Sequence, residues 1–322
     1  MGNRGVEPTL VDGVKIARGA CVPESPRVSV IVPAFESPWL EEALASVRAQ
    51  GCAELEIVVV DDGAPVPIAP RKTDDLVMVR QSNTGPGGAR NRGVEIARGE
   101  WVAFIDSDDR WTPGKLEAQM ALHDAHPKCI LSCGDSRLDD GSAQPTVSMP
   151  PEHRRDGYQL ITFERLFLEN RVACSTAMVR RDAYRRAGGM PAHRRLAEDY
   201  ALWLRLAQQG SVAFIDRVLC VRRPHDNSLT ATSRRAGDFV RQEREVYEEF
   251  LAEYPSLRNE PFVATAFARL DAEETYQHLE NGAFHMARKT VRQLVRRHPG
   301  SAWTWRMLAR AYLGIGSRHA TQ

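Results

Sequence analysis

Short apolar runs alternate with amphipathic stretches in the first half of the chain. The runs at residues 28–32, 57–60 and 101–105 are continuous, which is typical of strands buried on both faces of a parallel sheet. A shorter run at residues 77–79 predicts a further strand. Stretches with helical spacing lie between these runs, and such alternation indicates an α/β fold with right-handed crossovers. We therefore predict a Rossmann-like, mostly parallel central sheet flanked by helices.

The pattern changes near residue 234, where strand signals end and Glu, Arg, Ala and Leu recur with helical spacing. The helices predicted there cover residues 238–254, 261–280, 282–298 and 301–313. We expect this all-helical extension to bind a protein partner or to self-associate.

The first residues of the chain are rich in Gly, Pro and charge and contain no apolar core of a signal peptide. They predict a flexible leader at residues 1–26. The predicted domains are then an α/β domain at 27–233 and a helical domain at 234–322.

Polar residues follow three of the predicted strands at the point where each strand ends. The first strand is followed by residues 33–36, the second by Asp61 and Asp62, and the strand at 101–105 by three acids within four positions. In open α/β sheets, ligands bind beyond the carboxyl ends of the strands. Neighbouring unpaired carboxylates repel one another, and oxygen ligands suit Mg²⁺ or Mn²⁺. These strand ends therefore predict one ligand site. On its own, the acidic cluster after residue 105 is either a divalent-cation site or a solvated acidic turn.

Composition narrows the classes of partner. The 322 residues contain 43 Lys and Arg against 42 Asp and Glu, so no charge bias indicates nucleic acid. No apolar run approaches the ~18 residues of a membrane span. The six cysteines form no Cys-x-x-Cys pair, which favours reduced thiols. We expect a cytoplasmic protein, either free or peripheral to the membrane.

Six motifs in fixed order carry a family resemblance. They are VSVIVPAFE (28–36), VVVDDG (58–63), NTGPGGARN (83–91), FIDSDDRW (104–111), EDYALWL (198–204) and RRPH (222–225). Together they resemble the family 2 glycosyltransferases with a GT-A fold, over roughly residues 27–230. The resemblance implies an inverting transfer of a sugar from a nucleoside-diphosphate sugar, with a UDP-sugar favoured, to an acceptor hydroxyl. It also implies assistance by Mg²⁺ or Mn²⁺.

The resemblance assigns metal and donor roles to individual residues. Asp106 and Asp108 match the family's Asp-x-Asp motif, with Asp108 as the direct ligand and Asp106 beside the ribose or a metal-bound water. Asp109 either shares one of these roles, as a metal ligand or a donor contact, or caps the following turn. His225 matches a late histidine near the diphosphate or the metal, so the metal set is Asp106, Asp108 and His225.

Further residues are expected to contact the donor. Phe35 is available to stack on the base, Asp62 is expected to contact uracil, and Asp61 is expected to hydrogen-bond local backbone. The full set of expected donor contacts is Pro33, Ala34, Phe35, Glu36, Asp62, Arg90, Asn91, Asp106 and Ser107. Residues 83–91 are not a dinucleotide fingerprint, because Arg90 stands where the third glycine belongs.

The catalytic base is predicted from the Glu198-Asp199 pair. Direct displacement with inversion needs a carboxylate that accepts the proton of the acceptor hydroxyl. In the resemblance this is the second acid, Asp199, while Glu198 orients the acceptor or the loop. A helix N-terminus favours the anion, so we expect Asp199 to be ionised at neutral pH.

Other functions remain open at this point. A nucleotidyltransferase also has an acid-rimmed nucleotide fold but does not need Asp199. A non-catalytic nucleotide-sugar binder would use its helical tail to recruit partners. No Gln-x-x-Arg-Trp motif follows Asp199, which argues against a processive synthase. We expect the acceptor to be a glycan, a lipid-linked sugar or a small molecule, selected by residues 134–197.

Overall fold

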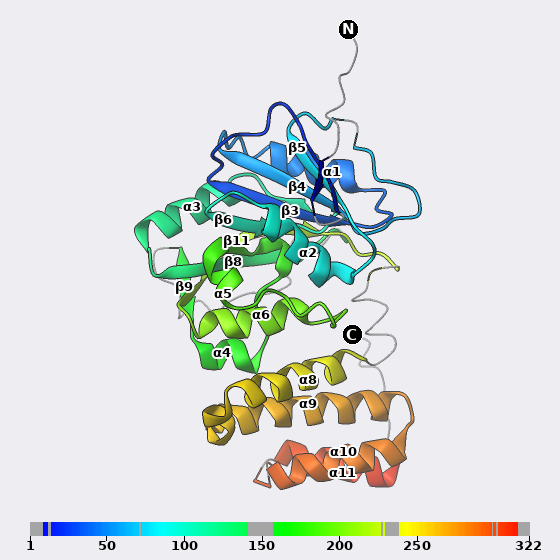
Figure 1. The fold of residues 1–322 in the computed structure, drawn as a ribbon. Coiled ribbons are helices and arrows are strands. Elements are labelled where there is room, and N and C mark those ends of the chain that lie inside the picture. Colours follow the sequence, from blue (N-terminus) through cyan, green and yellow to red (C-terminus); the bar gives the residue numbers. More distant parts are fainter. Residues whose placement is uncertain are drawn as a thin grey trace. The chain divides into compact units, whose positions relative to one another are not determined.

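The computed structural model describes residues 9–11, 14–70, 72–140, 157–226, 228, 238–297, 299–300 and 302–314. These residues form two compact units (Figure 1). Unit 1 comprises Met1–Phe163 and Asn170–His225, and unit 2 comprises Glu164–Glu169 and Asp226–Gln322.

Unit 1 is built on one eleven-stranded mixed sheet with the order β1-β2-β5-β4-β3-β6-β10-β8-β11-β7, and β9 pairs with β11. The strands are β1 (Thr9–Val11), β2 (Val14–Arg18), β3 (Val28–Ala34), β4 (Leu55–Asp61), β5 (Leu76–Arg80), β6 (Trp101–Phe104), β7 (Arg110–Trp111), β8 (Cys129–Leu138), β9 (Tyr158–Ile161), β10 (Met178–Arg180) and β11 (Ser211–Arg222). The helices of this unit are α1 (Leu40–Arg48), α2 (Gly85–Ile96), α3 (Lys115–Ala125), α5 (Arg181–Arg186) and α6 (Glu198–Ala207).

The parallel part of the sheet is the run β5-β4-β3-β6. Its apolar positions are buried on both faces, as their continuous pattern predicts; Val30, Ile31 and Val32 are fully buried. The neighbours of this run pair antiparallel, so the sheet as a whole is mixed. The predicted α/β fold with a helical extension is confirmed.

Helix α2 lies very close to strand β3. A Cβ atom built on Gly93 would lie 2.3 Å from Cγ2 of Ile31, so only glycine fits at this position. The close approach fixes Arg90, one turn earlier in α2, beside the carboxyl end of the sheet. The sequence thereby places a cation near the predicted site.

The predicted flexible leader is wrong for part of its length. Residues Val14–Arg18 form β2, which pairs antiparallel with β5, and Arg18 donates a 2.7 Å hydrogen bond to the buried carboxylate of Glu56. A short strand that adds to an open sheet edge is stabilised by its partner rather than by its own sequence, and this partner is distant along the chain.

Unit 2 is helical in all its described elements. It contains α8 (Asp238–Glu253), the 3-10 helix η3 (Pro255–Asn259), α9 (Pro261–Glu280), α10 (Phe284–Arg297) and α11 (Ala302–Leu313). Most of helix α4 (Phe163–Leu168) also belongs to this unit, where the Phe167 ring stacks on Tyr247 with centroids 4.5 Å apart. None of the helices in the described part of the chain could cross a membrane.

Candidate active site

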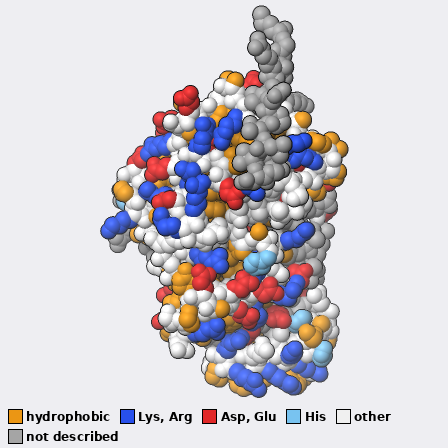
Figure 2. Space-filling view, viewed as in Figure 1, with side chains coloured by type: hydrophobic (Ala, Val, Ile, Leu, Met, Phe, Trp, Pro, Cys, Tyr) orange, Lys and Arg blue, Asp and Glu red, His pale blue; other side chains and the backbone are white. Residues whose placement is uncertain are grey.

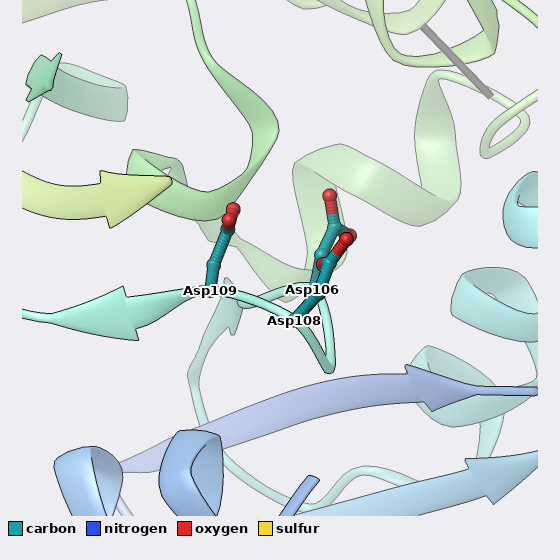
Figure 3. A group of neighbouring side chains, drawn as sticks. All are labelled: Asp106, Asp108 and Asp109. Carbon is teal, nitrogen blue, oxygen red and sulfur yellow. The ribbon is translucent and has the colours of Figure 1, made fainter. Parts of the chain in front are cut away.

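Three carboxylates gather directly after β6. Asp106, Asp108 and Asp109 each have an oxygen within 4.8 Å of the others, and Figure 3 shows the three side chains on the same side of their loop. Asp106 and Asp108 are half-buried and Asp109 is buried. Burial and the charge of Asp106 raise the pKa of Asp108, as expected where neighbouring anions lack a balancing cation.

Asp109 is held by polar groups of the protein. Its Oδ2 accepts a 2.6 Å hydrogen bond from the hydroxyl of Ser175, and its Oδ1 accepts one of 3.2 Å from the backbone N–H of Arg223. The same Ser175 oxygen accepts the backbone N–H of Asp106 at 3.1 Å. Asp109 therefore fixes the shape of the loop at residues 106–109, which we call the acidic loop. The sequence alone leaves Asp109 as either a site residue or a cap of the following turn.

Asp108 faces His225, as the metal prediction requires. The two side chains are 2.7 Å apart between Oδ2 of Asp108 and Nε2 of His225. Trp39 packs against the imidazole with ring centroids 4.8 Å apart, and the guanidinium of Arg223 lies 5.2 Å from the Trp39 ring. The structure thus brings His225 to the Asp-x-Asp motif from the far end of the domain.

Arg90 joins the acidic loop to the start of α6. It is 4% exposed, and its guanidinium donates 2.6 Å to Asp106 Oδ1 and 2.7 Å to Glu198 Oε1. The prediction that Arg90 contacts the donor diphosphate remains a prediction. The observed contacts give Arg90 a second role, because it neutralises one acid of each group.

Asp199 lies at the second position of α6, as predicted, but the helix N-terminus does not keep it fully ionised at neutral pH. Burial and the charge of Glu198 raise the pKa of Asp199 to about 7. The backbone N–H of Tyr200 donates a 2.7 Å hydrogen bond to Asp199, which favours the anion but does not outweigh the burial. Burial also raises the pKa of Glu198.

Asp61 and Asp62 organise backbone at the end of β4. Asp61 accepts the N–H groups of Ala64 and Ile68 at 3.0 and 3.1 Å, which confirms its predicted local role. Asp62 accepts the N–H groups of Thr84 and Gly85 at 3.0 and 2.9 Å, so it holds the start of α2. The predicted contact of Asp62 with uracil remains untested.

Asn91 has a structural role that the sequence did not reveal. Its amide donates 2.7 Å to the carbonyl of Met190, and its Oδ1 accepts the N–H of Met190 at 2.9 Å and the hydroxyl of Tyr184 at 2.6 Å. These bonds tether the segment before α6 to α2. A donor contact by Asn91 would have to compete with them.

The loop after β3 is placed beside the acidic loop. Pro33 and Ala34 are the last residues of β3, and Phe35 is 46% exposed. Glu36 is exposed and has a φ of 48°, a left-handed conformation that turns the chain sharply. The hydroxyl of Ser37 donates 3.0 Å to the carbonyl of Ser107, so this bond ties the two predicted nucleotide-binding loops together.

Sequence reasoning missed Ser175, Trp39 and the double ion pair of Arg90. Ser175 lies in a 3-10 helix, η2 (Cys174–Thr176). Trp39 carried a detectable signal, because an aromatic residue beside a polar strand end often faces a ligand rather than the core. No local pattern marks Ser175.

The residues present suit a divalent cation. Asp106 and Asp108 offer hard oxygen atoms, and His225 offers a nitrogen at hydrogen-bond distance from Asp108. Asp109 is held by Ser175. Of Asp106 and Asp108, only Asp106 is paired with a guanidinium, that of Arg90. A cation between Asp108, Asp106 and His225 would balance the charge of Asp108, which is paired with no guanidinium in the described part of the chain.

Comparison with known proteins identifies the family. Residues 29–188 match the model of glycosyl transferase family 2, which is about half of the chain. The chain belongs to this family of glycosyltransferases, and it is therefore an enzyme of sugar transfer.

Similar sequences carry related names. The putative teichuronic acid biosynthesis glycosyltransferase TuaG of Bacillus subtilis is 29% identical over 221 residues, covering 66% of this chain and 84% of TuaG. The uncharacterized glycosyltransferase RT0329 of Rickettsia typhi is 27% identical over 65% of this chain and 67% of that protein. The succinoglycan biosynthesis protein ExoW of Rhizobium meliloti is 41% identical, but the match spans only 28% of this chain and 32% of ExoW.

Two solved structures have a similar fold. S. aureus TarS 1–349 in complex with UDP has a TM-score of 0.60 at 20% identity, covering 90% of this chain and 88% of that chain. The mannosyltransferase PcManGT from Pyrobaculum calidifontis, in complex with GDP-Man and Mn²⁺, has a TM-score of 0.57 at 21% identity, covering 92% and 82%. At these identities the likeness concerns the fold alone.

Proposed function

We propose that this enzyme transfers a sugar from a nucleoside-diphosphate sugar, preferably a UDP-sugar, to an acceptor hydroxyl with inversion at the anomeric carbon. One observation carries the proposal: Arg90 connects Asp106 of the acidic loop to Glu198 of the acid pair. Groups suited to a diphosphate and a group suited to proton transfer are thereby held at one site.

In this proposal the nucleotide-sugar donor and the cation bind at the acidic loop. Asp106, Asp108 and His225 would bind Mg²⁺ or Mn²⁺, and the bound cation would neutralise negative charge that develops on the leaving diphosphate. The exposed ring of Phe35 is positioned to stack on the base. The complexes of TarS with UDP and of PcManGT with GDP-Man and Mn²⁺ support this class of donor and cofactor.

Asp199 acts as the general base. The acceptor oxygen forms a bond to the anomeric carbon while the bond from that carbon to the diphosphate oxygen breaks. The acceptor proton passes to a carboxylate oxygen of Asp199, so charge and atoms balance. A pKa of about 7 suits this task, because a general base is most effective when its pKa lies near the working pH.

The proposed acceptor is a glycan, free or lipid-linked. The relatives TuaG and ExoW are named for teichuronic acid and succinoglycan biosynthesis, and both products are glycans. Absence of a Gln-x-x-Arg-Trp motif favours addition of one sugar at a time. We propose that the reaction takes place in the cytoplasm or at the membrane surface.

The deciding experiment offers the full chain a panel of UDP-, GDP- and dTDP-sugars with Mn²⁺ and follows nucleotide release. We expect one UDP-sugar to turn over, and NMR of the product to show inverted anomeric configuration. Retained configuration would contradict the proposed base. Release of pyrophosphate from a nucleoside triphosphate and a sugar 1-phosphate would identify a nucleotidyltransferase, and donor binding without turnover would identify a non-catalytic binder.

A further inference from the structure

The charges of unit 2 are divided along its sequence. Residues 238–280 contain eleven Asp and Glu against four Lys and Arg, whereas residues 281–322 contain eight Lys and Arg and no Asp or Glu. The whole chain has a net charge of only +1, so the division is local. Figure 2 shows Lys and Arg side chains gathered over the α10–α11 end of this unit. Such segregation indicates a surface for an anionic partner.

Exposed side chains of α10 and α11 meet where Arg292 contacts Tyr312. Helix α10 exposes Lys289, Arg292 and Arg296, which follow one another at helical spacing. Helix α11 exposes Trp305, Arg306 and Tyr312. Arg292 Nε donates a 2.9 Å hydrogen bond to the Tyr312 hydroxyl, which joins the two helices. We call the six side chains named here the α10–α11 face.

The cations of α10 and α11 differ in their partners. Arg297 pairs with the fully buried carboxylate of Asp271, and Arg288 donates 3.0 Å to the carbonyl of Ala311, so these two stabilise the helical packing. Within the described residues, no ion pair is formed by the three remaining exposed cations: Lys289, Arg296 and Arg306. Their charge serves no internal contact and is available to a partner.

Helix α11 also exposes apolar side chains. Trp305 is 49% exposed, Tyr312 is 46% exposed, and Leu313, the next residue along the chain, is 71% exposed. The Trp305 N–H already donates 2.6 Å to the carbonyl of Pro299. Its exposed ring therefore presents apolar surface rather than an unsatisfied donor.

We propose that the α10–α11 face binds the surface of a lipid bilayer that contains anionic phospholipids. Lys and Arg near a negatively charged leaflet are attracted to its phosphates, and Trp and Tyr rings favour the boundary between headgroups and acyl chains. An exposed leucine gains stabilisation from that boundary but none from the sugar–phosphate chain of a nucleic acid. The face therefore attaches this enzyme to the membrane peripherally.

The test is flotation of the full chain with vesicles of phosphatidylcholine alone and of phosphatidylcholine with 30% phosphatidylglycerol. We expect binding to the anionic vesicles only, and loss of binding at 0.5 M NaCl. The variant Lys289→Glu/Arg296→Glu/Arg306→Glu should lower the partition coefficient roughly a hundredfold. A matched control, Arg186→Glu/Arg217→Glu/Arg258→Glu, changes three exposed arginines elsewhere and should change it less than threefold.

Thermal unfolding of each variant verifies folding, and a Gln version of the α10–α11 triple replaces the Glu version if the latter unfolds. Three results would overturn the proposal: equal binding to both vesicles, equal loss in the control, or binding to heparin without binding to vesicles. The test needs no sugar donor. Its failure would leave the proposed transferase activity untouched.

Discussion

Unit 1 contains two groups of acids that are linked by Arg90, and the carboxylates of the two groups have different hydrogen-bond partners. After β6, Asp106 is paired with Arg90, Asp108 faces His225, and Asp109 is held by Ser175. At the start of α6, Glu198 shares Arg90, whereas the one hydrogen bond described for Asp199 comes from a backbone N–H. Among these acids, Asp199 is the one for which the described residues supply neither an ion pair nor a side-chain donor.

The difference shows how partners determine the role of a carboxylate. An acid with a guanidinium remains charged and fixed in place, and an acid close to other anions and a histidine suits a cation. Burial raises the pKa of both Asp109 and Asp199 to about 7. Asp109 is held by the Ser175 hydroxyl and a backbone N–H, so Asp199 is the acid of the two that is better placed to exchange a proton.

The largest effect is expected for the base itself. Asp199→Asn keeps the size of the side chain but removes the proton acceptor, so kcat should fall about 10²–10⁴-fold. Donor affinity, measured by calorimetry, should change little because the role proposed for Asp199 is toward the acceptor. The control Asp182→Asn alters an exposed acid of α5 and should leave kcat unchanged. Full activity in the Asp199 variant would assign proton transfer to another group.

The second effect separates two adjacent acids. Asp108→Asn should weaken Mn²⁺ binding at least a hundredfold, because it would remove the proposed direct ligand. Changing a residue that only supports a ligand typically costs roughly 10–100-fold in affinity. Asp109→Asn should weaken Mn²⁺ binding less, because Asp109 is occupied by Ser175 and the backbone of Arg223. Calorimetric titration with Mn²⁺ measures both. Equal losses would mean that Asp109 is itself a ligand.

The third prediction breaks the link between the two groups. Arg90→Met leaves Asp106 and Glu198 without their shared cation, and loss of one partner of a buried ion pair costs about 3–5 kcal/mol of folding stability. Arg92→Met, two residues along the same helix, removes only a surface pair with Glu95 and should cost no more than about 1 kcal/mol. Urea unfolding measures both values. Similar midpoints would show that Arg90 is dispensable for the fold.

Much of the fold is visible in the sequence, because its strongest signals are local. The strands β3, β4 and β6 follow from continuous apolar runs, and helices α8 to α11 begin and end close to the predicted residues. Strand β2 was missed because its stability comes from β5, about sixty residues away. Strand β11 is harder to read from the sequence, because its pairing with β8 is irregular between Ile215 and Val218.

The sequence predicted the residue types of the site, but it did not predict most of their hydrogen-bond partners. The acids at the strand ends, and Asp199 at a helix start, lie where the sequence placed them. The hydrogen bonds of Asp62 and Asn91 could not be foreseen, because their partners lie 22 to 99 positions along the chain. The pKa of Asp199 was mispredicted for the same reason, since it depends on burial and not on the helix end alone.

The smallest predicted effect concerns the pH dependence of the reaction. Asp199 accepts a proton only when ionised, and its pKa is about 7. In the free enzyme, kcat/KM should therefore fall about tenfold for each pH unit below 7 and level off above it. The groups that set this pKa include Glu198, which raises it, and Arg90, which lowers it. Replacing Arg90 should thus move the limb of the profile to higher pH, provided that the variant remains folded. A limb near pH 4 would instead mean that Asp199 is ionised like an exposed acid, and the contrast between the two acid groups would disappear.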